Sequence, residues 1–411
     1  MGNQLETLVS SFVLALLTER IFLVDGATVH HLLQPPDGMR WHWELLFNEL
    51  GERFIHSRSH MVNLQWQNPL EFSSLLCNDL SSYYKDQFVF LFSDQYYLPA
   101  LQHNPHYSEF FREWFPPVDI FGPLVRFLVR PRPPVAAEIV RFYKRLVSGN
   151  NDKSSKRIIG IQLRTATMKG FDAEFCAWDS WAMADYTAAY FKCALLMDHL
   201  AQASDSNIRH MHHQHSSTID LPTAADVTSV FGSGSEDHSK ESVVFFLATD
   251  NESVRPLAKA ALGSRVHYYE QEVTRKINVG HATALIDMFL LSLSDDIITT
   301  SMSTFGYVAA GIASLPPVLL SFQAQCAREL TSQPCFHKWM YVKHGSCYNR
   351  TSMISPGTLN PSSSIFLPSM PPSIRHPILR PPIPPPSPFR GRLVARKQRR
   401  MRFIRQLYAS L

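Results

Sequence analysis

Two segments that lie far apart in the sequence constrain most strongly what this chain can fold into. The first, Ile158 to Phe171, opens with the apolar run IIGIQL. The second, His281 to Ile312, holds a helical pattern, the short apolar run DIITT and a turn of small residues, SMSTFG, before another helical pattern. Short apolar runs between helical patterns are typical of buried parallel strands. Ligands of such open sheets bind outside the carboxyl ends of the strands, so we expect Gln162 and Arg164 to lie at a binding site.

The same alternation extends along the chain, which favours parallel sheets with helices on both faces. The strand-like runs are 20–25, 88–92, 157–163, 243–250, 265–270, 296–300 and 317–321. The helical patterns are 5–18, 107–115, 135–147, 181–203, 252–262 and 280–294. A polar, turn-rich stretch at 148–156 marks the expected domain boundary. We therefore predict an α/β fold with two Rossmann-like domains facing a cleft, one over residues 1–150 and one over 151–350.

The formal charge of +4 belongs to the C-terminal tail. Residues 371–411 hold ten Lys and Arg and no acid, which leaves 29 basic and 35 acidic residues elsewhere, a net charge of −6. We therefore expect no nucleic-acid partner. Twelve of the 28 prolines fall between 356 and 388. Because this composition cannot bury enough apolar surface to offset the entropy of ordering, we predict a disordered, Pro-rich and basic tail over 351–411.

Residues 204–241 interrupt the second domain with a polar insertion that contains His210, His212, His213 and His215. Histidine-rich tracts can bind metals. No acidic or cysteine ligand stands beside these histidines at the spacing of a metal site, which favours a solvated surface loop.

The most apolar window, Leu5 to Leu23, is interrupted by charged residues, among them Glu6. It therefore predicts a core helix followed by a strand rather than a membrane span. It also has no basic leader or cleavage site, so we expect no signal peptide.

The two opening segments resemble those of the plant xyloglucan-type α-1,2-fucosyltransferases and, more distantly, the α-1,6- and protein O-fucosyltransferases. The start, MGNQLETLVSSFVLALLTERIFLVDG, resembles the first block of the family, and residues 92–116 resemble the block before the nucleotide domain. The resemblance covers Met1 to about Arg350. It implies a GT-B-like arrangement, with residues 1–150 on the acceptor side and residues 151–350 binding GDP-fucose. It also implies metal-independent transfer, without a cofactor, in the Golgi lumen.

Members of this family are typically type II Golgi membrane proteins. This chain begins inside their first block, so we expect that a membrane anchor and stem are missing from it.

Arg164 is the strongest candidate for a catalytic residue. A GDP leaving group develops negative charge on its β-phosphate, and a planar guanidinium offers two fixed donors to such an anion. The resemblance places the phosphate-binding arginine of the family at Arg164. The alternative is an arginine in a structural ion pair.

Gln162 and Asp287 are the candidate guanine-binding residues. The related α-1,6 enzymes place a histidine two residues before the arginine, where this chain has Gln162, and an aspartate in the later helix. A carboxylate can accept hydrogen bonds from guanine N1–H and N2–H₂. The alternative for Asp287 is an acid on the helix surface. His281, at the start of the same helix, is a further nucleotide contact or a structural histidine.

The turn before the last helical pattern offers hydroxyls and free N–H groups to a phosphate. Ser and Thr there are also ordinary helix caps. The resemblance to the STFGY element of the family favours Ser303 and Thr304 for phosphate contact, with Ser301 and Phe305 beside them. It also places Asn3, in the Gly-Asn turn of the first block, at the GDP-fucose site.

Inverting transfer needs a base within reach of the acceptor hydroxyl, unless the departing diphosphate takes that role. Asp172 follows Arg164 at an offset at which some relatives have a carboxylate, and it is the candidate base. In the resemblance, Cys326, Cys335 and Cys347 follow the cysteine spacing of the family. They are the candidates for disulfides, and Cys335–Cys347 is one plausible pair.

The resemblance implies inverting transfer of L-fucose from GDP-fucose to a galactose-terminated glycan of the cell wall, xyloglucan-like, or of a glycoprotein, with an α-1,2 linkage. Two alternatives stay open. One is a GDP-sugar- or glycan-binding pseudoenzyme, and the other is a protein O-fucosyltransferase.

Overall fold

The computed structural model describes most of the first 334 residues. The described ranges are 1–64, 69–115, 119–148, 156–165, 183–207, 243–269, 277–300, 303–320, 326–329 and 331–334. The predicted histidine cluster of the insertion and the predicted disordered tail lie outside these ranges. Helix α11 (Met183–Asn207) extends to Asn207, so the first residues assigned to the insertion are helical.

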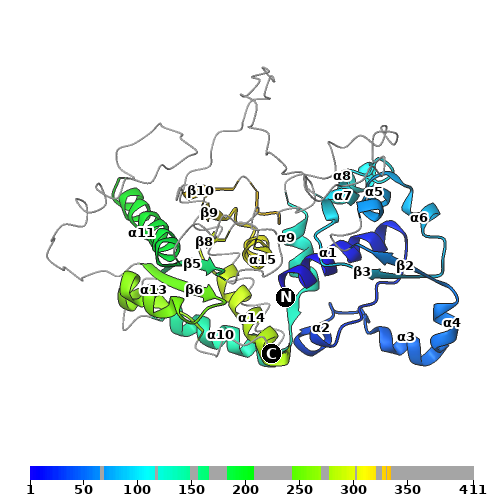
Figure 1. Ribbon diagram of the computed structural model, residues 1–411, viewed down its shortest axis with the longest axis horizontal. Helices are drawn as coiled ribbons and strands as arrows, with labels where there is room; N and C mark the ends of the chain where they lie inside the picture. The colour runs from blue at the N-terminus through cyan, green and yellow to red at the C-terminus, as the bar shows by residue number, and fades with distance from the viewer. Residues whose placement is uncertain are drawn as a thin grey trace, which may run out of the picture.

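A six-stranded sheet forms the centre of the C-terminal half (Figure 1). Its order is β10-β9-β8-β5-β6-β7, parallel except for β10 at one edge. The strands are β5 (Arg157–Leu163), β6 (Val243–Thr249), β7 (Val266–His267), β8 (Asp296–Thr299), β9 (Val318–Leu320) and β10 (Cys326–Arg328). The five parallel strands confirm the predicted runs and the α/β fold. The three-residue β10 was not predicted.

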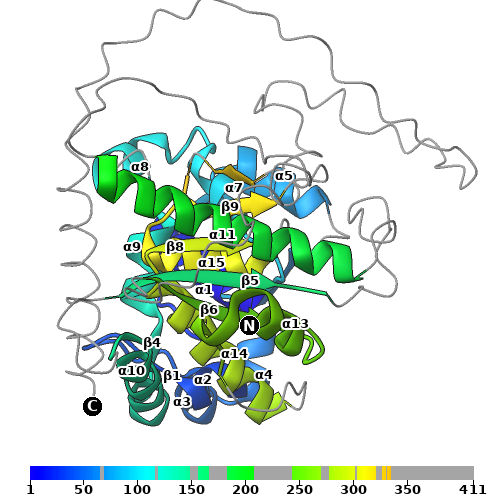
Figure 2. The ribbon, with the colours of Figure 1, turned by 90° about the vertical axis from the view of Figure 1, so that its left-hand side faces the viewer.

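The central strands are apolar throughout because helices cover both faces of the sheet. Alternate residues of β5 enter different cores: Ile158 packs in one, and Ile159 and Ile161 pack in the other. Helices α11 and α13 (Val254–Leu262) cover the second core. Helices α10 (Pro133–Val147), α14 (Ile277–Ser292) and α15 (Thr304–Ala313) cover the first core. Figure 2 shows α11 on one side of β5 and β6, with α10 and α14 on the other.

The order of the strands creates a crossover point at β5. The chain runs from β5 to β6 and β7 on one side, and then returns to β8 and β9 on the other. Adjacent loops therefore diverge at the carboxyl ends of β5 and β8, which is where open α/β sheets bind their ligands.

The N-terminal half is built mainly of helices (Figure 1). Helix α1 (Gly2–Leu17) contacts α15, α9 (Phe121–Leu128) and α7 (Leu98–Gln102). The other helices are α2 (Ala27–Leu32), α3 (Trp43–Leu50), α4 (Glu52–His56), α5 (Pro69–Cys77), α6 (Leu80–Tyr83) and α8 (Ser108–Trp114). One hydrophobic core continues from α1 to the face of the central sheet, and it includes both Leu5 and Leu290.

The N-terminal half departs from the sequence prediction in its strands. Within described residues 1–148 there are two two-stranded sheets. One is the parallel pair β2 (Ser59–Asn63) and β3 (Phe88–Phe92), and the other is the antiparallel pair β1 (Leu33–Gln34) and β4 (Arg130–Pro131). A second Rossmann-like domain is therefore not confirmed, and the boundary near residue 150 stays a prediction.

The predicted strand at 20–25 was wrong. That segment forms only an isolated bridge between Val24 and His42. The run enters the core only in part: Val24 is buried there and Phe22 packs against it, whereas Ile21 is 86% exposed.

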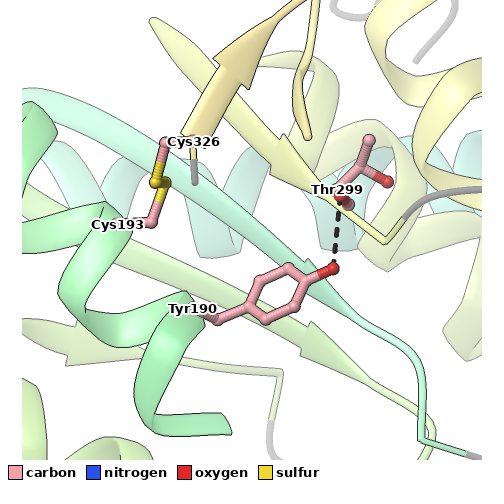
Figure 3. The surroundings of a disulfide bond; sticks show 4 residues. All are labelled: Tyr190, Cys193, Thr299 and Cys326. Carbon is pink, nitrogen blue, oxygen red and sulfur yellow. Dashed lines mark hydrogen bonds between the residues drawn. A yellow bond between two sulfur atoms is a disulfide. The ribbon is translucent and has the colours of Figure 1, made fainter. Parts of the chain in front are cut away.

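A disulfide joins Cys193 of α11 to Cys326 of β10 (Figure 3). Cys326, a predicted disulfide candidate, therefore does form a disulfide, and its partner, which lies 133 residues earlier, was not predicted. Cys335 and Cys347 lie outside the described residues. Among the described helices, none is long and apolar enough to cross a membrane.

Candidate functional site

Arg164 directly follows β5, at the carboxyl edge of the sheet. Its backbone N–H donates to Thr300 Oγ1 at 3.0 Å, which ties the end of β5 to the loop after β8. Its side chain is half-buried, and no described residue forms an ion pair with the guanidinium. Burial and then the charge of Arg164 lower the pKa of the Met1 amino group. Arg164 therefore places a positive charge close enough to the start of α1 to act on the Met1 amino group.

The start of α1 lies directly against the start of α15. Thr304 Oγ1 donates to Asn3 Oδ1 at 2.6 Å. A Cβ atom on Gly2 would lie 2.7 Å from Thr304 Oγ1 and 2.9 Å from the backbone nitrogen of Phe305. Glycine at position 2 therefore permits this close approach. Two helix N-termini, each with free N–H groups and a positive dipole end, meet beside Arg164.

Ser303 is the N-cap residue of α15, but its side chain forms no capping hydrogen bond. The residue is 1% exposed, and its buried Oγ has no hydrogen-bond partner in the described part of the chain. A buried polar atom without a partner is costly, which makes Ser303 a candidate for ligand contact. Phe305 packs against the hydrophobic core, which accounts for its aromatic ring without a ligand.

Gln162 lies under the first turn of α15 rather than facing outward. Its Oε1 accepts hydrogen bonds from Thr299 Oγ1 at 2.6 Å and from the Thr300 backbone N–H at 3.1 Å. A Cβ on Gly306 would lie 1.6 Å from Thr299 Oγ1, so this turn packs closely on the same group. Gln162 therefore holds the loop between β8 and α15, and guanine contact by this residue stays a prediction.

Sequence reasoning missed Thr299, Thr300 and Tyr190. The hydroxyl of Tyr190, on α11, donates to the Thr299 carbonyl at 3.4 Å (Figure 3) and to Thr300 Oγ1 at 3.3 Å. Both threonines end an otherwise apolar run, and that switch from apolar to polar at a strand end was the available signal. Tyr190 offered no such signal, because a tyrosine on an amphipathic helix is equally typical of an ordinary core position.

Asp287 lies in α14, and its Oδ1 is buried with no hydrogen-bond partner among the described residues. Burial raises the pKa of Asp287 to about 8, against the opposing effect of Arg255. Arg255 donates to the carbonyl of Tyr269 at 3.2 Å and places its guanidinium over the Tyr268 ring, 5.0 Å from the centroid. An aromatic ring, a cation and a buried carboxyl oxygen without a hydrogen-bond partner in the described ranges thus gather near the carboxyl ends of β6 and β7.

His281, in the second turn of α14, reaches towards α2. Thr28 Oγ1 lies 3.4 Å from His281 Nδ1. Burial lowers the pKa of His281, and the nearby Met1 amino group adds to the effect. The structure thus gathers Arg164, Asn3, Ser303, Thr304 and His281 around the start of α1. Ser301 and Asp172 lie outside the described residues, so their predicted roles stay predictions.

The sequence profile described as Xyloglucan fucosyltransferase matches residues 55–344. Among curated relatives, "Probable fucosyltransferase 7" of Arabidopsis thaliana is 26% identical, over 82% of this chain and 65% of the relative. The "Galactoside 2-alpha-L-fucosyltransferase" of Arabidopsis thaliana is 27% identical, over 88% of this chain and 65% of the relative. The chain thus spans slightly less than two thirds of the length of these relatives.

The fold is similar to that of a mutant of Arabidopsis thaliana FUT1 solved in complex with GDP, with a TM-score of 0.56 and 21% sequence identity. The similarity covers 82% of this chain and 73% of that one. The profile match extends over more than half of the sequence and includes β5, α14 and the start of α15. This chain belongs to the xyloglucan fucosyltransferase family.

Proposed function

We propose that this chain transfers L-fucose from GDP-fucose to a galactoside, with inversion, to form an α-1,2 linkage. The observation that carries the proposal is the meeting of the α1 and α15 N-termini beside Arg164, at the crossover point of the sheet. A guanidinium and two helix starts together match the charge of a diphosphate better than any one of them would.

The diphosphate would lie over the start of α15. The free N–H groups there and the Ser303 hydroxyl would donate to phosphate oxygens, and Arg164 would bind the β-phosphate. Asn3 already holds Thr304 in place by the 2.6 Å hydrogen bond. The donor side of the site thus depends on both ends of the described chain, α1 as well as α15.

The guanine would lie towards Asp287. A guanine base has two adjacent donors, N1–H and N2–H₂, and the buried Oδ1 of Asp287 lacks a partner. Hydrogen bonding to the charged form of a carboxylate favours that form, so guanine would lower the pKa that burial has raised. Adenine offers no such pair of donors at its N1 edge, which makes Asp287 the proposed selector for guanine.

In the reaction, the acceptor oxygen forms a bond to C1 of fucose while the bond from C1 to the β-phosphate oxygen breaks. Negative charge grows on that leaving oxygen, where Arg164 stabilises it. The hydroxyl proton passes to a base or to the departing diphosphate. Asp172 is the proposed base.

The relatives named galactoside 2-alpha-L-fucosyltransferase, from Arabidopsis thaliana and Pisum sativum, support a galactoside acceptor. We extend the proposal to a Golgi-lumenal reaction that needs no metal. Activity unchanged by a chelator would support the second point, and activity restored only by added Mg²⁺ or Mn²⁺ would refute it.

The full chain should be incubated with GDP-fucose and galactose-terminated xyloglucan oligosaccharides, and the products analysed by mass spectrometry and linkage analysis. We expect one added fucose at the 2-position of galactose. Removing the Arg164 guanidinium, as Arg164→Gln, should lower kcat by about 10²–10³-fold, as for the loss of a transition-state donor. Arg112→Gln, at an exposed surface ion pair, is the control. No transfer to any galactoside, with GDP binding intact, would contradict the proposed activity.

A further inference from the structure

A surface pocket of about 490 Å³ lies between the N-terminal half and the helices of the central sheet. Its described lining comes from three elements: α2, the start of α10 and the second turn of α14. Its volume is within the range of small-molecule sites and is large enough for one or two sugar residues.

The polar lining of the pocket is basic. His30, His31 and Arg132 contribute to it, and no carboxylate is among the described lining residues. The neighbouring His42, which does not itself line the pocket, stacks its ring on that of His30 at a centroid distance of 4.2 Å. Burial, then His30, and also Arg132 lower the pKa of His42, against the opposing effect of the largely exposed Glu44. The lowered pKa disfavours the charged form of His42, so among the described lining residues Arg132 supplies the permanent positive charge.

The histidines do not favour a metal ion here, although His30, His42 and Glu44 have ligand atoms within 4.8 Å of one another. The two imidazole planes are 26° apart and stacked, so one ion cannot lie near the plane of both rings. His30 Nε2 is also within 2.8 Å of the Val24 carbonyl, where it acts as a donor. The geometry therefore disfavours a metal ion at this pair of histidines.

The rest of the described lining is apolar and consists of Leu32, Pro133, Pro134, Val135 and Ala282. The two prolines begin α10 and have no N–H, so this helix start cannot donate at those positions. Recognition of an anion would therefore depend on the side chains of Arg132 and His31. Basic and apolar side chains in one pocket match a sugar ring that has a carboxylate on one edge and C–H groups on its face.

The pocket lies at the same edge of the sheet as Arg164. Helices α10 and α14 precede the parallel strands β5 and β8, so both helices begin at the carboxyl edge of the sheet. Ala282 adjoins His281, which contacts Thr28 of α2 and lies near the start of α1. A glycan bound in the pocket would therefore extend along the edge that holds the proposed donor site.

We propose that this pocket binds a carboxylate-bearing sugar residue, a uronic acid, of the acceptor glycan. The proposal rests on the proposed function, since it assigns the chemistry of part of the acceptor. A bidentate pair between Arg132 and the carboxylate would give most of the discrimination against a neutral sugar. His31, which is exposed, would donate a second hydrogen bond.

The test measures binding of trigalacturonic acid to the full chain by calorimetry at low ionic strength, with neutral galactotriose as the comparison. We expect the acid to bind at least about tenfold more tightly than the neutral sugar, a typical effect of a charge-assisted pair. Arg132→Gln and His31→Gln should each weaken binding of the acid severalfold. Arg130→Gln is the matched control, because Arg130 is paired at the surface with Asp37 at 2.8 Å and does not line the pocket.

Several outcomes of this test would overturn the proposal. Equal affinity for both sugars, no binding by the folded wild type, or equal losses in Arg132→Gln and Arg130→Gln would overturn the uronic-acid pocket. Displacement of trigalacturonic acid by GDP would also overturn the proposal, because the pocket would then be part of the GDP-binding site. His31→Gln changes an exposed side chain, so it keeps the test valid if Arg132→Gln fails to fold. GDP binding is measured separately, and its loss would count against the fucosyltransferase proposal alone.

Discussion

The side-chain oxygen of Gln162 accepts two hydrogen bonds, and both come from the loop that leads to α15. Thr300 extends this network to Arg164 and Tyr190 through its own hydroxyl. At the scale of single residues, the candidate site therefore depends on buried polar atoms whose partners come from three elements. Such networks stabilise one arrangement of the loop when every member is satisfied.

Replacing Gln162 with leucine removes the acceptor and leaves Thr299 Oγ1 and the Thr300 N–H buried without it. We expect Gln162→Leu to lower the free energy of unfolding by about 1–3 kcal/mol. It should also weaken GDP binding, because the start of α15 shifts. Urea unfolding measures the first effect and calorimetry the second. Gln87→Leu is the control: Gln87 is exposed, and its side-chain oxygen accepts from the exposed Arg58 at 3.3 Å. Equal stability of the two variants would contradict the buried role of Gln162.

The raised pKa of Asp287 predicts how the free energy of unfolding depends on pH. Its pKa is about 8 in the folded protein, whereas an unfolded aspartate titrates near about 4. Between these values the folded state holds a proton that the unfolded state has released, so this group favours folding at low pH and loses that contribution as the pH rises towards 8. Asp287→Asn should therefore flatten the fall in unfolding free energy between pH 5 and 8. Asp37→Asn, at an exposed acid, should leave the slope unchanged. An unaltered slope in Asp287→Asn would show that the carboxyl group titrates normally.

At the scale of elements, apolar runs predicted the strands well where helices bury both faces. In the central sheet β5 begins and ends at the predicted residues, β6, β8 and β9 differ by a residue or two, and β7 covers two of its six predicted residues. β3 lies outside that sheet and is only half-buried, and it also matches its predicted bounds. The strand predicted at 20–25 was wrong, because apolar composition alone does not show whether a neighbouring strand is present to pair with the segment. The carboxyl-end position of Arg164 followed from the strand pattern. The buried position of Gln162 was not predicted, because its hydrogen-bond partner Thr299 lies on β8, far from Gln162 in the sequence.

The strands β5, β8 and β10 share one buried ion-pair group. Asp296 is 2% exposed and pairs with Arg157 and with Arg328, the latter at 2.8 Å. Burial alone would raise the pKa of Asp296, but Arg328 and Arg157 outweigh it and the pKa is lowered. This stabilisation is present above the usual aspartate pKa and is lost as the pH falls through the lowered value.

Asp296→Asn leaves both arginines without their counter-charge. We expect it to lower the free energy of unfolding at pH 7 by about 3 kcal/mol, the cost typical of breaking a buried pair. The difference from wild type should shrink below pH 4. Asp37→Asn, at a 95% exposed acid, should change stability by less than about 0.5 kcal/mol. Chemical unfolding at several pH values measures both. A loss in Asp296→Asn no larger than in the control would contradict the structural role of the group.

At the scale of the whole molecule, two long-range links hold the described elements together. Helix α1 reaches from the N-terminal half to α15, and the Cys193–Cys326 disulfide joins α11 to the edge strand β10. Neither link was predictable in detail. The sequence predicted the blocks that meet, but not that a disulfide would join the middle of the chain to its last described strand.

Removing the disulfide tests the second link. The bond closes a loop with a separation of 133 residues, and cross-links of long loops stabilise by about 2–4 kcal/mol. We expect the double variant Cys193→Ala with Cys326→Ala to lose stability in that range and to melt at a lower temperature. Because Cys77 is also disulfide-bonded, reductant should lower the melting temperature of the wild type by more than that of the variant. Equal melting temperatures in oxidising buffer would show that the link contributes little.

The most direct test of the donor site is calorimetry of GDP binding to the full chain and to Arg164→Gln, with ADP and UDP as comparisons. Arg164 is the charged group that both the sheet topology and the two helix N-termini place at the site. We predict that the wild type binds GDP in preference to ADP and UDP, and that Arg164→Gln, folded as judged by its melting curve, loses at least about tenfold in affinity. GDP affinity unchanged in Arg164→Gln, or equal affinity for all three nucleotides, would contradict the site.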